Sequence, residues 1–281
     1  MLTTIAILFA GALFAGLIGS LTGLGGGVVI IPLLTLVFGV DIRYAIGTSL
    51  ISVIATSSGA ASSYVKEGLL NIRIGMFLEI ATTLGAIAGA AIAVFAPTHA
   101  IAIIFGLVLI YSAINSLQMK TQDGERGDSE VKNSGKWVKL LKAEGTYTTG
   151  TETKDYKLRN LGGGFSVMGV AGILSGLLGI GSGALKVIAM DSVMRIPFKV
   201  STSTSNFMIG VTAAASAGIY LSRGYIDPLL SMPVMLGVLI GSLTGAKILV
   251  KAQTRKIRIV FAIVITFLAI EMIYNGITKS I

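Results

Sequence analysis

The chain has 281 residues, 53% of them hydrophobic and 12% charged, with a formal net charge of +9 and a mean hydropathy of +0.86. Ordinary soluble domains are about 25% charged, so this composition predicts a polytopic membrane protein rather than a soluble globule. With no cysteine, and with His99 as its only histidine, the sequence excludes disulfide frameworks, thiolate metal sites and histidine-based zinc or haem sites. The basic residues lie in short loops between apolar segments, which indicates membrane orientation and argues against nucleic-acid binding.

Apolar windows occur in two groups, separated by a polar stretch at 119–160. The first group comprises 2–21, 24–38, 44–65, 72–95 and 99–118, and the second comprises 161–178, 180–194, 200–222, 228–250 and 257–276. The windows predict an all-α membrane protein with about ten membrane segments, since a helical span needs about 20 apolar residues. The second window of each group is shorter and follows a glycine run, so it is either a full span or a half-helix.

The two groups repeat each other. Residues 16–118 align without a gap on residues 172–274, at a constant offset of 156 (172 − 16). Identical residues recur at this offset, including Gly23/Gly179, Gly25/Gly181, Gly27/Gly183, Thr48/Thr204, Ser49/Ser205, Tyr64/Tyr220, Gly68/Gly224, Gly85/Gly241 and Gly89/Gly245. Whether the short windows span or not, each half crosses the membrane an odd number of times, so the halves are expected to be inverted. Inverted repeats are typical of secondary transporters, whose site lies where the repeats meet.

The loop charges predict an orientation. A cytoplasmic connector at 119–160 and five crossings per half would put most of the Lys and Arg residues on the cytoplasmic side. These are the connector's own basic residues together with Lys66, Arg73, Arg195, Lys199, Lys251, Arg255, Lys256 and Arg258. Arg43, Arg223 and Lys279 would remain outside, as would both termini. The expected division is a first membrane repeat at 1–118, the connector, and a second repeat at 161–281.

The connector differs in composition from both repeats. Residues 146–158 alternate Thr and Tyr with polar residues, which predicts a small hairpin. A solvated linker and a regulatory or docking segment are both compatible with the rest of it.

Glycine-rich junctions precede the short window of each half. In hydrocarbon, a broken backbone is tolerated only where protein or a water-filled cavity satisfies its polar groups. A break followed by a helix N-terminus presents free N–H groups, which suits an anion. The alternative is close helix packing through small residues. The candidate substrate-binding residues here are Gly25, Gly26, Gly27, Gly181, Ser182 and Gly183.

Hydroxyl clusters form the second candidate group. Neutral donors bind an oxyanion reversibly, although Ser and Thr in membrane helices also bond back to helix carbonyls. The candidates are Thr48, Ser49, Thr204, Ser205 and, adjoining them, Asn206.

Two ionisable residues within the apolar windows complete the candidate site. Lys186 aligns with Ile30 of the first half, and a lysine in a membrane segment is costly and usually functional. It is a candidate counter-charge for an anion, a partner for Asp191 or Glu79, or a side chain that snorkels to water. Glu79 is a candidate proton-coupling carboxylate or a structural partner. The paired Gly85/Gly89 and Gly241/Gly245 predict close helix packing.

The chain has no catalytic triad, metalloprotease or nucleotide-binding motif, so neither an enzyme nor a cofactor is predicted. It resembles the TauE/SafE family of sulfite and sulfonate transporters, the toluene sulfonate uptake permeases. The resemblance rests on Gly16–Gly19, Gly25–Gly27 with Pro32, Ala45–Ser49, Gly68–Asn71, Gly179–Val187, Thr204–Gly210, and Tyr220 with Gly224. Ser182 and Ile188 depart from the family pattern, which usually has glycine and often proline there.

The resemblance implies transport, often outward, of small sulfur-containing anions such as sulfite or organosulfonates across the cytoplasmic membrane. The expected mechanism is alternating access. A passive anion channel and a non-transporting membrane binding or assembly protein, acting through 119–160, are the alternatives. The sequence leaves the particular anion, the coupling ion and the oligomeric state open.

Overall fold

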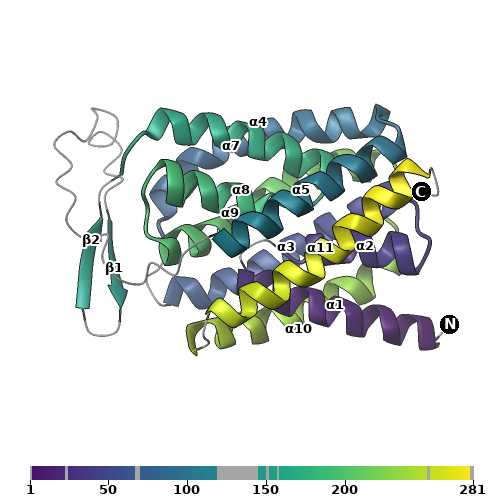
Figure 1. Ribbon diagram of the computed structural model, residues 1–281, viewed down its shortest axis with the longest axis horizontal. Helices are drawn as coiled ribbons and strands as arrows, with labels where there is room; N and C mark the ends of the chain where they lie inside the picture. The colour runs from purple at the N-terminus through teal and green to yellow at the C-terminus, as the bar shows by residue number, and fades with distance from the viewer. Residues whose placement is uncertain are drawn as a thin grey trace.

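The computed structural model describes residues 2–22, 25–66, 70–118, 145–149, 152–156, 158–251 and 254–278. These segments form a helical bundle with a β-hairpin at one end (Figure 1). Three helical segments are long and apolar enough to cross a membrane, namely Ile72–Phe95, Leu161–Leu178 and Pro228–Gly245. Shorter apolar helices lie at Ile5–Ser20, Gly27–Val37, Thr98–Ile114 and Ala262–Ile277. The predicted helical membrane class is confirmed in this respect.

The first half contains α1 (Leu2–Thr22), α2 (Gly27–Pro32), the π-helix η1 (Leu33–Val37), α3 (Ile42–Lys66), α4 (Ile72–Phe95) and α5 (Thr98–Gln118). The second contains α7 (Leu161–Leu178), α8 (Gly183–Ile188), the π-helix η2 (Ala189–Val193), α9 (Phe198–Ser222), α10 (Pro228–Lys251) and α11 (Thr254–Ile277). Each bound of α2, η1 and α3 recurs 156 residues later (183 − 27) in α8, η2 and α9.

The short windows do not span a membrane. The six residues of α2 and the five of η1 together rise roughly 16 Å at 1.5 Å per residue. This length is too short to cross a hydrocarbon core of about 30 Å. The same lengths recur in α8 and η2. The windows 24–38 and 180–194 are therefore half-helices. Pro32 precedes η1 whereas Ile188 precedes η2, so the π-helical turn does not depend on a proline.

The two half-helices end at opposite ends of the bundle. Asn71, at the start of α4, donates a 2.6 Å hydrogen bond to the Tyr156 hydroxyl of the hairpin, so α4 begins at the hairpin end. Past the other end of α4, the Ala96 carbonyl accepts a 2.9 Å bond from Arg43, which follows η1. By contrast, the residue after η2, Met194, accepts a 3.0 Å bond from the amide of Arg159, near the hairpin. Both termini lie at the end away from the hairpin (Figure 1).

Glycines allow two helix pairs to approach closely. On α4, Gly85 and Gly89 lie against the backbone of α7, where an added Cβ would meet the Gly169 and Ile173 carbonyls. On α10, Gly241 and Gly245 lie in the same way against α1. The predicted packing role of these glycine pairs is confirmed. Under the 156-residue offset the pair α4–α7 exchanges with the pair α10–α1.

The hairpin pairs β1 (Gly145–Thr149) with β2 (Glu152–Tyr156), antiparallel, from Gly145 opposite Tyr156 to Thr149 opposite Glu152. It falls within the stretch where alternating residues predict a hairpin. Tyr156 and the following Leu158 are buried in a core that also includes Ile74 and Met168. The predicted connector otherwise lies mostly outside the described residues, at 119–144, 150–151 and 157.

Candidate functional site

The two glycine breaks meet at the centre of the bundle. Gly25 and Gly181 both have left-handed backbones, with φ of +77° and +68°. A Cβ added at Gly25 would lie 3.2 Å from Ile209 and 3.5 Å from Val53. One added at Gly181 would lie 3.0 Å from Ile209 and 3.1 Å from Val53. Val53 of α3 and Ile209 of α9 are themselves 156 residues apart (209 − 53), so one equivalent pair of side chains contacts both breaks.

The predicted serines lie beside these breaks. Ser49 donates a 2.8 Å hydrogen bond to the Gly179 carbonyl, and Ser205 donates a 3.2 Å bond to the Gly183 carbonyl. Gly27 lies directly against the Ser49 hydroxyl, where no Cβ would fit. Both serines are fully buried. The structure therefore gathers Ser49, Ser205 and the glycines around one region.

The predicted threonines instead connect helices. Thr48 shares a 3.2 Å hydrogen bond with Ser231 of α10, and Thr204 accepts a 3.2 Å bond from the amide of Asn71. Asn71 lies at the hairpin end, so Thr204 lies on the hairpin side of its neighbour Ser205. The four hydroxyls thus form two kinds of contact, one at the breaks and one between helices.

Two predicted site residues are buried without hydrogen-bond partners among the described residues. These are Asn206, at both amide atoms of its side chain, and Ser182, at its hydroxyl. Ser182 has a left-handed backbone with φ of +47° and makes no side-chain cap to α8. A buried polar atom without a partner is costly. These two side chains are therefore available to a ligand that enters the region.

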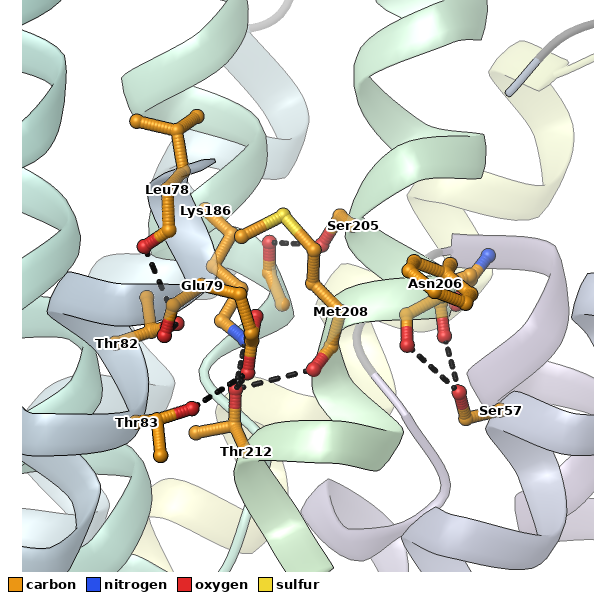
Figure 2. Close-up of polar contacts among 12 residues, drawn as sticks. Ser57, Leu78, Glu79, Thr82, Thr83, Lys186, Ser205, Asn206, Met208 and Thr212 are labelled. Carbon is orange, nitrogen blue, oxygen red and sulfur yellow. Dashed lines mark hydrogen bonds and ion pairs between the residues drawn. The ribbon is translucent and has the colours of Figure 1, made fainter. Parts of the chain in front are cut away.

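A buried charged cluster forms where α4, α8 and α9 meet (Figure 2). Lys186 of α8 is fully buried, and its Nζ donates a 2.5 Å hydrogen bond to the Thr212 hydroxyl of α9. Nζ lies 3.7 Å from Oε2 of Glu79, which is 5% exposed on α4. Of the two acids that the sequence offers as partners, Glu79 pairs with Lys186. The expectation that Lys186 snorkels to water is wrong, because the surrounding helices enclose its whole side chain.

Threonine hydroxyls hold the Glu79 carboxylate in place. Thr212 donates a 2.5 Å hydrogen bond to Oε1, and Thr83 donates a 3.2 Å bond to the same oxygen. Oε2 has no hydrogen-bond partner among the described residues. An ion pair taken out of water remains favourable only when both charges stay together, since an isolated buried charge costs several kcal/mol.

Sequence reasoning missed Thr212, although the repeat contains a signal for it. Thr212 lies 156 residues after Thr56 (212 − 56), so the halves share a threonine here. Among the described residues, Thr56 bonds back to the Ser52 carbonyl of its own helix, at 2.9 Å. The first half has buried Ile30 in place of Lys186. Lys186 therefore has no charged equivalent in the first half, and the cluster joins Lys186 and Thr212 of the second half to Glu79 of the first.

Backbone breaks inside a bundle of apolar helices, together with a buried ion pair, define a membrane transport protein. The sequence model of the family described as "Sulfite exporter TauE/SafE" matches residues 8–272. The chain therefore belongs to the TauE/SafE sulfite exporter family.

Relatives from bacteria, archaea and plants are similar to this chain. The probable membrane transporter protein YunE of Bacillus subtilis is 29% identical, over 96% of this chain and 98% of its own length. The probable membrane transporter protein MJ0441 of Methanocaldococcus jannaschii is 23% identical, over 92% of this chain and 91% of its own. Sulfite exporter TauE/SafE family protein 5 of Arabidopsis thaliana is 30% identical, over 50% of this chain and 36% of its own. No solved structure matches the chain at comparable significance.

Proposed function

We propose that this protein is a secondary transporter that exports small sulfur-containing anions, such as sulfite or organosulfonates, across the cytoplasmic membrane by alternating access. The family assignment supports the substrate class. The observation that carries the mechanism is the meeting of the two glycine breaks between Val53 and Ile209. A site at the contact between two halves is accessible to either side when one half moves against the other.

The two halves act as inverted repeats in this proposal. Three observations support the inversion: the matching bounds at the 156-residue offset, the exchange of the helix pairs α4–α7 and α10–α1, and the half-helices that end at opposite ends. The connector end faces the cytoplasm and both termini face outward, because the basic residues concentrate toward the connector.

The anion is bound at the breaks. Backbone amides at Gly25–Gly27 and Gly181–Gly183 and the hydroxyls of Ser49 and Ser205 surround it, while Asn206 and Ser182 supply the donors that lack partners among the described residues. Thr48 and Thr204 contribute by fixing the neighbouring helices. These neutral donors add no charge of their own, which favours release of the ligand, as transport requires.

Flux in proteoliposomes tests the proposal. The purified protein should move labelled sulfite or methanesulfonate, with saturation and with counterflow against unlabelled anion. Counterflow distinguishes a transporter from a passive channel, and absence of flux together with absence of anion binding would favour a binding or assembly protein.

A matched pair of variants connects the flux to the site. Asn206→Leu introduces the residue that the first half has at the equivalent position, Leu50, and should raise the half-saturating anion concentration at least tenfold. Gly218→Ala on the same helix meets no atom within 4 Å and should transport normally. Equal affinity in both variants would remove Asn206 from the site.

A further inference from the structure

The chemistry of the buried cluster indicates which ion moves together with the anion. We propose that Glu79 and the substrate anion compete for Lys186, so that one proton binds to Glu79 whenever one anion binds beside Lys186. This inference rests on the proposed function and adds its coupling ion. It makes Glu79 an internal substitute for the transported anion.

The first step of the argument is the isolation of the pair. Among the residues whose burial the structure describes, Lys186 and Glu79 are the only charged side chains that are buried. An anion drawn to Lys186 would therefore meet the Glu79 carboxylate and no other buried charge. Like charges at such distances repel strongly in a medium of low dielectric constant. Anion binding and an ionised Glu79 thus exclude each other.

The neighbouring elements contain few other groups that titrate. Helix α7 has no titratable side chain, and α8 has only Lys186. The remaining titratable groups on the elements around Glu79 are Arg73 on α4, Asp191 on η2, and Lys199 and Tyr220 on α9. The Tyr220 hydroxyl donates a 3.2 Å hydrogen bond to the Gly176 carbonyl. Asp191 is half-buried on the π-helix that follows α8.

The carboxylate has a free position for the proton. Thr212 and Thr83 both donate to Oε1, whereas Oε2 accepts no hydrogen bond from the described residues. A proton from water on the loading side can bind Oε2 while both threonine bonds persist. Lys186 keeps its proton and its bond to Thr212, and its charge is then balanced by the anion. On the other side the anion leaves, Oε2 returns its proton to water, and the internal ion pair re-forms.

The position of the cluster connects it to the breaks. Lys186 is three residues beyond Gly183, in the half-helix that begins at the second break. Ser205 bonds the Gly183 carbonyl from the same helix, α9, that supplies Thr212. An anion held at the break therefore lies within the electric field of the lysine. Because Lys186 is fully buried, it gains access to the anion only through the movement that opens the site.

The exchange has a consequence for energetics. A monovalent anion that moves with one proton transfers no net charge, so the membrane potential neither drives nor opposes it. The flux then follows the product of anion and proton concentrations on each side. Binding linkage is reciprocal, so acidification must tighten anion binding by the same factor by which the anion promotes proton uptake.

Methanesulfonate is the appropriate probe because its charge does not change between pH 5.5 and 8.5, which leaves the protein as the source of any pH effect. With wild-type protein in liposomes, each methanesulfonate that enters should carry about one proton, measured with an internal pH dye. The apparent affinity should fall as the pH rises, by up to about tenfold per pH unit. A potassium diffusion potential set with valinomycin should leave the flux unchanged.

Two isosteric variants separate a coupling role from a structural one. Glu79→Gln should bind methanesulfonate with pH-independent affinity and exchange it without moving protons. Glu271→Gln alters a carboxylate on α11 and should remain coupled like the wild type. Both are compared by size exclusion and thermal unfolding, and the wild-type proton count decides the question even if Glu79→Gln does not fold.

The possible failures are distinguishable. Wild-type flux without proton movement, or proton coupling that persists in Glu79→Gln, would overturn this inference and leave the proposed function intact. No wild-type flux of either methanesulfonate or sulfite would overturn both.

Discussion

The Ser49 hydroxyl donates a 2.8 Å hydrogen bond to the carbonyl oxygen of Gly179 and so joins the third helix of the first half to the glycine break of the second. Gly179, whose carbonyl accepts this bond, ends α7 in a left-handed conformation, with φ of +68°. The break is therefore fixed from across the contact between the halves. When one half moves against the other, this bond must either break or move the glycine break together with α3.

The second break should tolerate no side chain. In Gly181→Ala the new methyl group would lie about 3 Å from both Val53 and Ile209 in a left-handed backbone, and we expect a loss of roughly 2–4 kcal/mol in unfolding free energy from strain and crowding. Thermal unfolding in detergent measures it. Gly218→Ala, in open space on α9, is the control and should change stability by less than about 0.5 kcal/mol. Equal melting temperatures for the two variants would contradict the packing described for the break.

The buried pair should depend on both partners. Lys186→Met leaves the Glu79 carboxylate without its counter-charge, which should cost about 3–5 kcal/mol. The double variant Lys186→Met/Glu79→Gln removes both charges and should regain most of that loss, because no buried charge is left unpaired. A double-mutant cycle of unfolding free energies gives the coupling. Strictly additive losses would show that the two charges do not interact.

The close approach of α4 and α7 should depend on the glycines that lie at the contact between the two helices, and not on glycines elsewhere in them. Gly89→Ala drives a methyl group into the Ile173 carbonyl, whereas Gly169→Ala on α7 itself meets no atom within 4 Å. We expect Gly89→Ala to destabilise the protein by about 1–3 kcal/mol and Gly169→Ala to be neutral or slightly stabilising. Comparing their unfolding midpoints in the same detergent tests this, and the reverse ranking would be incompatible with the helix contact.

Alkaline pH should weaken the docking of the hairpin. Burial raises the pKa of Tyr156, with the Asn71 hydrogen bond acting in the opposite direction. In the unfolded chain the phenol ionises near pH 10, so the native state binds more protons above that pH. The stabilisation is complete below about pH 10 and is lost as the pH rises towards the folded-state pKa.

Tyr156→Phe isolates this effect. The variant should lose about 1 kcal/mol at pH 8 with the hydrogen bond to Asn71, and its disadvantage should shrink between pH 9 and 11. Unfolding at each pH, with the half-exposed Tyr111→Phe as control, measures the difference. Parallel curves for Tyr156→Phe and the wild type would contradict the assignment.

Much of the fold was predictable because it depends on local signals. Apolar length identifies the helices, and glycine freedom locates the breaks at Gly25 and Gly181. The sequence also shows that Val53 and Ile209 are equivalent residues of the repeat. It does not show that both of them contact both breaks. The π-helical turns were not predictable, since Pro32 precedes one and Ile188 the other.

The candidate site was predictable only in part. Lys186 and Glu79 stand out as ionisable residues in apolar windows, but their pairing depends on which faces of α4, α8 and α9 meet. Thr212 resembles any helix hydroxyl until Lys186 is seen beside it. A repeat aligns residues with their equivalents and carries no information about contacts between non-equivalent positions.

The hydrogen bond between Asn71 and Tyr156 couples the position of α4 to that of the hairpin. Asn71 caps the helix through the amide of Ile74 while it holds the hairpin, and Glu79 lies about two turns further along the same rigid rod. A shift of the carboxylate should therefore displace the hairpin as well. A spectroscopic label on the hairpin, in a chain with no native cysteine to remove, would then report the state of the buried ion pair.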